Sequence, residues 1–214
     1  DAERTLVHKL TDSGARTIVT ANFPGLVPMA RKLVAEGHAD RVIAGDENLW
    51  GAPPFASEPV DESAPILNFE GLLNGAAEAI DFPKPGADDI ALIQYTGGTT
   101  GLPKGAMLTH GNIRSMVSMV NAWHGPQRHI EPGERVLAVL PLFHIYGIGV
   151  VMMRALDIGA HVVLRTRFET EANVRDIEEK RINIFAGVPT MWIALANFPG
   201  IEQRDLSSLK FCGT

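Results

Sequence analysis

The sequence predicts an α/β fold built from mostly parallel sheets that are flanked by helices. Short apolar runs of strand length alternate along the chain with amphipathic stretches of helix length. Most of these runs are almost continuously apolar, which is typical of strands buried on both faces of a parallel sheet. Apolar residues make up 45% of the 214 residues, enough for a sizeable core in one or two domains.

The N-terminal part of the chain predicts two helix–strand pairs. Apolar side chains recur at helical spacing, and each helix meets a glycine, Gly14 or Gly37, that favours its end. An apolar run that favours a strand follows each glycine. The predicted helices are residues 2–12 and 25–36, and the predicted strands are residues 15–21 and 41–45.

Residues 53–85 differ in composition from their surroundings. Six of the 14 prolines of the chain fall in this stretch, and its apolar periodicity is weak. Because proline interrupts both helices and sheets, we expect a surface excursion that contributes no core element. A short helix over residues 69–79 is the element predicted within it.

The remaining chain continues the alternation of strands and helices. Further strands are predicted at residues 89–95, 136–140, 161–165, 182–188 and 209–213, and further helices from about 110–112, over 146–157 and over 170–181. A break near residues 125–135 predicts a subdomain boundary. The first portion is then 1–128, including a glycine-rich loop at 95–105, and the second is 129–214.

Residues 136–153 carry no formally charged side chain, so their length alone would allow a membrane-spanning helix. Pro141, His144, Gly147 and Gly149 interrupt this segment, however, and they disfavour one continuous helix that faces lipid. We therefore predict a buried strand, a tight loop and then a buried helix.

Composition and charge exclude several classes of function. A net charge of −6 and a pI near 5.6 provide no electrostatic footprint for nucleic acid. The single cysteine, Cys212, rules out an intrachain disulfide and suits a reducing, cytoplasmic location. The histidines and Cys212 show no metal-ligand spacing, so no metal ligand is predicted, and the G-x-S-x-G elbow of serine hydrolases does not occur. From its first residue, Asp1, and its last, Thr214, we expect an excerpt of a longer chain.

The stretch "YTGGTTGLPKG", residues 95–105, predicts a site for a polyphosphate. Its glycines allow the backbone to approach a ligand, and successive N–H groups in such a loop form a concave anion site. Three threonines add hydroxyl donors, and Lys104 adds a positive charge. The spacing is not that of G-x-x-x-x-G-K-[ST], because Pro103 and Gly105 occupy positions of that motif. A glycine-rich hairpin turn, with threonines present for β propensity, is the alternative.

Four quoted stretches resemble the adenylate-forming (AMP-binding) superfamily, most of all a long-chain fatty acid–CoA ligase. "YTGGTTGLPKGAMLTH" is similar to the family's signature loop, and "LPLFHIYGIG" to its second core motif. "FAGVPTMW" resembles the segment near the acyl pocket, and "DLSSLKFCGT" the lead-in to the adenine loop. The resemblance covers nearly the whole chain and implies an internal part of the family's large N-terminal domain.

The resemblance implies roles for particular residues. The β- and γ-phosphates of ATP would be bound by Thr96, Gly97, Gly98, Thr99, Thr100, Gly101 and Lys104. His144 would lie beside the carboxylate and the α-phosphate, although a satisfied core histidine is the alternative. Val188, Pro189 and Thr190 would border the acyl pocket and Gly213 would approach the adenine, with ordinary strand-end packing as the alternative.

The implied activity is that of an AMP-forming ligase with ATP, Mg²⁺ and coenzyme A as co-substrates. A carboxylic acid, most simply a fatty acid, would form an acyl adenylate and then a thioester. Peripheral contact with a membrane and dimerisation are open alternatives, and so is a catalytically silent relative that binds nucleotide or a partner. Because the family's magnesium, ribose and C-terminal lysine groups are not assigned in this chain, we expect the 214 residues alone to be inactive.

Overall fold

The computed structural model describes residues 2–49, 57, 60, 65–75, 81–97, 101–124 and 131–213. The chain divides into two compact units. The first comprises Asp1–Lys84 with Tyr95–Ala106, and the second comprises Pro85–Gln94 with Met107–Thr214. The expected boundary between residues 128 and 129 lies outside the described residues and stays a prediction.

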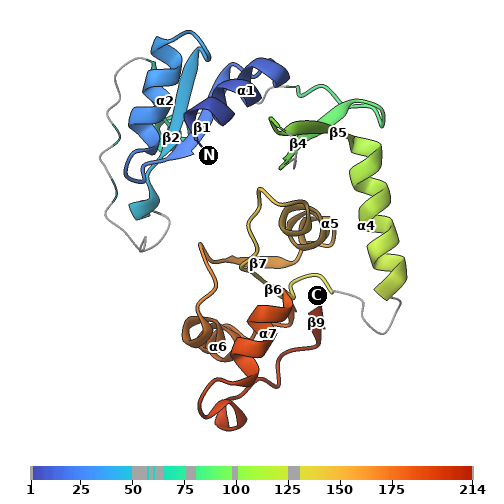
Figure 1. Cartoon of the computed structure of the whole chain (residues 1–214). Coiled ribbons are helices and arrows are strands. Elements are labelled where there is room, and N and C mark those ends of the chain that lie inside the picture. Colours follow the sequence, from blue (N-terminus) through green and yellow to red (C-terminus); the bar gives the residue numbers. More distant parts are fainter. Residues whose placement is uncertain are drawn as a thin grey trace. The chain divides into compact units, whose positions relative to one another are not determined.

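The first unit contains a parallel sheet in the order β1-β2-β3, of which Figure 1 labels β1 and β2. Apolar residues of α2, of the central strand β2 and of the edge strand β3 form its core. Gly14 ends α1 with a left-handed φ of 69°, as its position predicted. The elements are α1 (Glu3–Ser13), β1 (Thr17–Ala21), α2 (Leu26–Ala35), β2 (Arg41–Gly45), the 3₁₀ turn η1 (Glu47–Leu49), β3 (Ile66–Asn68) and α3 (Phe69–Asn74).

The prediction that residues 53–85 contribute no core element is wrong at β3. Ile66 is only 2% exposed and packs in the core of the first unit, and the strand pairs in parallel with β2. Three residues are too short to show a periodicity, so the proline content of the stretch hid the strand. The predicted helix near residue 69 is present as α3, whose first turn is capped by the Asn68 side chain.

The glycine-rich loop joins two strands that are hydrogen-bonded neighbours, β4 (Ile90–Thr96) and β5 (Lys104–Thr109). The hairpin alternative is therefore right about the strands on either side. Residues 97–103 form the connection, which is longer than a tight hairpin turn needs. Helix α4 (His110–His124) follows β5 directly, where the sequence predicted a helix to begin.

The second unit contains a four-stranded parallel sheet in the order β7-β6-β8-β9. Alternate residues of β6 enter two separate cores, one against η3 and α5 and the other against α6 and α7, so helices cover both faces (Figure 1). The α/β fold class is confirmed. The elements are β6 (Arg135–Ala138), η3 (Tyr146–Met153), α5 (Arg154–Asp157), β7 (His161–Leu164), α6 (Thr170–Glu179), β8 (Ile184–Ala186), α7 (Pro189–Ala196), η4 (Ile201–Gln203) and β9 (Phe211–Gly213).

The uncharged segment 136–153 has the predicted order of strand β6, loop and helix, but the helix is half-buried where a buried one was predicted. The helix begins with π-helical winding in η3, where the Arg154 N–H donates to the Gly149 carbonyl five residues earlier. Such winding is rare and occurs often at functional sites. None of the helices in the described part of the chain combines the length and apolarity that crossing a membrane requires.

Candidate functional site

The strands β4 and β5 bring Thr96 and Lys104 together at the two ends of the glycine-rich loop. The Thr96 hydroxyl donates to the carbonyl oxygen of Lys104 at 3.5 Å, and both side chains are exposed. A Cβ built on Gly97 would meet no atom within 4 Å, so open space adjoins the backbone there. In the described part of the chain, no acidic side chain forms an ion pair with Lys104. This arrangement leaves the Lys104 cation open to an anion, and the exposed Thr96 hydroxyl beside it is held only by a long hydrogen bond.

Gly98, Thr99 and Thr100 lie outside the described residues, so their predicted phosphate contacts stay predictions. Gly101, which follows these three residues in the sequence, is described and is exposed.

Helix α1 anchors the same loop, which the sequence did not reveal. The His8 Nε2–H donates to the carbonyl oxygen of Pro103 at 2.7 Å, one residue before Lys104. At the other end of the loop, the Tyr95 hydroxyl donates to Asp12 Oδ2 at 2.7 Å. Burial raises the pKa of Tyr95, and the hydrogen bond and charge of Asp12 raise it further. The phenol therefore stays a donor and holds the end of β4 against α1.

His144 lies in the loop between β6 and η3, and its side chain is exposed. The alternative of a satisfied core histidine is therefore wrong. Its backbone N–H donates to the Pro141 carbonyl at 3.0 Å, and its ring Nδ1 accepts the Tyr146 N–H at 3.2 Å. Because Nδ1 is an acceptor, the proton of the neutral ring resides on Nε2. His144 can thus offer an N–H donor to a carboxylate or phosphate oxygen.

A second contact holds the backbone on the N-terminal side of His144. The Gln94 side-chain amide, from β4, donates to the carbonyl oxygen of Phe143 at 2.7 Å. The loop is thereby fixed on both sides of the imidazole, which limits the orientations that the ring can adopt.

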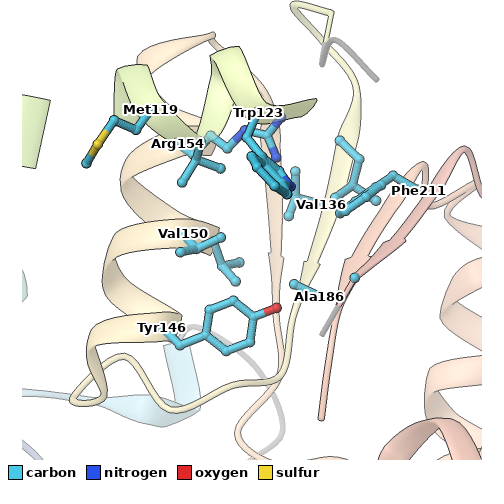
Figure 2. A pocket seen from close by; sticks show the side chains of 12 residues that line it. Met119, Trp123, Val136, Tyr146, Val150, Arg154, Ala186 and Phe211 are labelled. Atoms are coloured by element: carbon cyan, nitrogen blue, oxygen red, sulfur yellow. The ribbon is translucent and has the colours of Figure 1, made fainter. Parts of the chain in front are cut away.

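A cavity of about 380 Å³ lies next to η3 in the second unit. Mostly apolar side chains from α4, β6, η3, β8 and β9 line it, as Figure 2 shows. Tyr146 lies at one end of the helical wall, and its hydroxyl points toward Ala186 (Figure 2). Burial raises the pKa of Tyr146, so the hydroxyl remains protonated at neutral pH. A volume and lining of this kind suit the apolar part of a small organic ligand.

Arg154 is the charged residue that lines this cavity among the described residues. It is 3% exposed, and its Nε donates to Asn121 Oδ1 of α4 at 2.8 Å. Burial lowers the pKa of Arg154. The sequence analysis did not single out Arg154, although a signal was present, since residue 154 falls within a helix that was predicted to be buried.

Of the residues predicted near the acyl and adenine groups, Gly213 lines the cavity and the others do not among the described lining residues. Val188 packs against the core beneath the cavity, and Pro189 and Thr190 are exposed in the first turn of α7. A Cβ on Gly213 would lie 2.7 Å from the Phe211 ring, so a glycine is required for the ring to keep its position.

Within the described residues, no group of three or more histidine, cysteine, aspartate or glutamate side chains is placed to hold a metal ion. No described residue is therefore assigned to Mg²⁺.

Comparisons with known proteins agree on one family. The family model described as "AMP-binding enzyme" matches residues 2–214. A long-chain-fatty-acid–CoA ligase of Bacillus subtilis (strain 168) is 32% identical over 98% of this chain and 39% of its own length. A 4-coumarate–CoA ligase 2 of Oryza sativa subsp. japonica is 35% identical over 95% of this chain and 36% of its own. The chain thus spans less than half the length of these relatives.

A solved structure shares the fold. The ATP-bound crystal structure of MatB from Rhodopseudomonas palustris superimposes with a TM-score of 0.75 at 24% identity. The match covers 99% of this chain and 37% of that one.

Proposed function

The chain belongs to the family of AMP-binding enzymes, and on this premise we propose that the complete protein is an acid–thiol ligase. It activates a carboxylic acid with ATP and passes the acyl group to coenzyme A. In the first step, a carboxylate oxygen attacks the α-phosphorus of ATP and pyrophosphate leaves with the electrons of the broken P–O bond. In the second, the thiol sulfur attacks the acyl carbon and AMP leaves.

The observation that carries this proposal is the open anion site at the ends of the glycine-rich loop. Lys104 and Thr96 present a cation and a hydroxyl beside an unfilled space at Gly97, and α1 holds the backbone in place through His8. We assign to them the β- and γ-phosphates, together with Gly98, Thr99, Thr100 and Gly101. Neutralising the charge that develops on the departing pyrophosphate lowers the barrier of adenylate formation.

His144 is assigned to the reacting end of the acid. Its Nε2–H can donate to the carboxylate or to an α-phosphate oxygen, which draws the two reactants together and stabilises negative charge. We assign Gly213 to the adenine, and Val188, Pro189 and Thr190 to the border of the acyl pocket. Mg²⁺ would neutralise phosphate charge, and its protein ligands lie outside the residues assigned here.

The apolar cavity beside Tyr146 is assigned to the hydrocarbon part of the acid. The relatives named above act, by their names, on a long-chain fatty acid and on coumarate, so a fatty acid and an aryl acid are the two substrates to compare first. If the substrate is a fatty acid, we further propose that the protein is cytoplasmic, contacts a membrane peripherally and forms a dimer. We expect the 214 residues by themselves to form no acyl adenylate, since several groups must act together in such a step.

Carboxylate-dependent exchange of labelled pyrophosphate into ATP tests the proposal. The complete protein is assayed with ATP, Mg²⁺ and a panel of alkyl and aryl acids, and thioester formation is followed after coenzyme A is added. Exchange that needs both the acid and Lys104 supports the assignment. Nucleotide binding without exchange by any acid would favour a catalytically silent relative.

A further inference from the structure

Arg154 brings a positive charge into a cavity that is otherwise mostly apolar. Its side chain is 3% exposed, and the hydrogen bond from Nε to Asn121 Oδ1 is the contact that fixes it. Among the residues that the structure describes, neither Nη atom has a hydrogen-bond acceptor and no carboxylate pairs with the guanidinium. The guanidinium is thus fixed through Nε, while the Nη donors face no protein acceptor among these residues.

Such an arrangement is costly unless a ligand completes it. A guanidinium cannot lose its charge at physiological pH, even where burial lowers its pKa. A buried charge without a counter-ion carries a desolvation penalty that a single neutral amide offsets only in part. The planar donors of arginine match a carboxylate, which can accept two parallel hydrogen bonds.

The position of Arg154 along the cavity indicates which part of a ligand would reach it. Tyr146, two residues after His144, lies at the start of the η3 wall, and Arg154 lies where that wall passes into α5. Figure 2 shows the Arg154 side chain reaching toward Trp123, at the opposite end of the wall from Tyr146. An acid whose reacting carboxylate lies near His144 would therefore present its far end to the guanidinium.

We propose that Arg154 determines specificity by pairing with a second carboxylate at the far end of the acid, so that the preferred substrates are dicarboxylic acids. This inference rests on the proposed function, since it takes the cavity as the site of the acid. A purely hydrocarbon tail would leave the guanidinium donors buried and unpaired, and the site would bind it less well.

Matched acids in the complete protein test the inference. Pyrophosphate exchange is measured with straight-chain dicarboxylic acids and with the monocarboxylic acids of the same chain length. The unaltered protein should show the higher kcat/KM with the dicarboxylic member of the best pair. Arg154→Met should lower that kcat/KM by roughly 10- to 100-fold, mainly through KM, and leave the monocarboxylic acid unchanged or improved. Arg154→Lys, which keeps the charge, should retain part of the preference.

The control is Arg175→Met, the same substitution at an exposed position on α6, which should leave kcat/KM unchanged for both acids. The inference is overturned if Arg154→Met unfolds like the control but still prefers the dicarboxylic acid. It is also overturned if kcat/KM falls equally for both acids. If no acid supports exchange, the proposed function fails, and binding decides the inference separately. A dicarboxylic acid should then raise the unfolding temperature of the unaltered protein and not that of Arg154→Met, and the absence of that difference overturns it.

Discussion

Gly147 faces the carbonyl oxygen of Pro141 so closely that a Cβ on Gly147 would lie 2.3 Å from that oxygen. The same oxygen accepts the N–H of His144 at 3.0 Å. The turn that presents His144 and the first turn of η3 thus share one carbonyl group. The close approach is between backbone atoms, so no rearrangement of a side chain could make room for a methyl group.

Gly147→Ala should therefore destabilise the protein by about 1–3 kcal/mol and also reduce pyrophosphate exchange, because the His144 turn must shift. Urea unfolding and exchange measured on one preparation check both effects. The matched control is Gly149→Ala in the same helix, where the nearest atom to a Cβ is Met116 Cε at 3.0 Å, the far end of a flexible side chain. Equal stabilities for the two variants would contradict the backbone contact.

Periodicity predicted the helices and strands because apolar spacing and glycine ends are local features. Helices α1 and α2 begin and end within about two residues of their predicted limits, and the two-sided burial of β6 followed from its uninterrupted apolar run. Strand β3 was missed because three residues carry too little pattern. Its place depends on pairing with β2, which is a tertiary contact.

The candidate site divides in the same way. A motif in the sequence marked Lys104 and Thr96, and a resemblance marked His144, since both are patterns of neighbouring residues. The contacts that hold these residues in place join distant parts of the chain, such as His8 with Pro103 and Gln94 with Phe143. No local pattern encodes such pairs, so they emerge only when the chain is folded.

Asp176 provides a prediction about pH. Its side chain is 2% exposed and accepts from Arg165 Nη2 at 2.6 Å, and Lys180 Nζ lies 2.9 Å away. Burial alone would raise the pKa of Asp176, but the hydrogen bonds and charges of Arg165 and Lys180 outweigh it and lower the pKa below its ordinary value. Because the folded pKa lies below the unfolded one, the ionised carboxylate stabilises the fold above about pH 4, and this is lost as the pH falls further.

Asp176→Asn should lower the free energy of unfolding by about 3 kcal/mol at neutral pH, since it leaves Arg165 without its buried partner. The difference from the unaltered protein should shrink below about pH 4, where the aspartate itself becomes protonated. Urea unfolding at neutral and acid pH measures both quantities. Asp205→Asn, at an exposed ion pair with Arg181, is the control and should cost less. A difference that grows on acidification would reverse the assigned sign.

His8→Ala should raise the KM for ATP several-fold, by about 0.5–1.5 kcal/mol, because the Pro103 carbonyl loses the donor that anchors the loop. His8→Gln, whose amide can donate in the same direction, should recover part of the loss. His38→Ala, another histidine of the first unit, is the control. If His8→Ala and His38→Ala give the same KM, the anchor has no functional role.

Lys104→Ala should weaken transition-state stabilisation by about 1–3 kcal/mol, measured as kcat/KM for ATP in pyrophosphate exchange. Stability should hardly change, because the side chain is exposed and forms no ion pair among the described residues. Lys84→Ala removes an exposed lysine outside the loop and serves as the control. Unaltered ATP kinetics in Lys104→Ala would remove this lysine from the site.

His144→Ala should depress adenylate formation while the melting temperature falls only slightly. The side chain is exposed, and among the described residues its hydrogen-bond partner is the Tyr146 N–H, which donates to Nδ1. Loss of that bond exposes a backbone donor to water and costs about 1 kcal/mol or less, whereas loss of the Nε2–H removes the donor that we propose for the developing charge. His144→Asn, whose side-chain oxygen can accept from Tyr146, separates the two effects: it should restore the melting temperature but not the rate of exchange. A variant that regains exchange together with stability would show that His144 acts through the fold of its loop and not on the substrate.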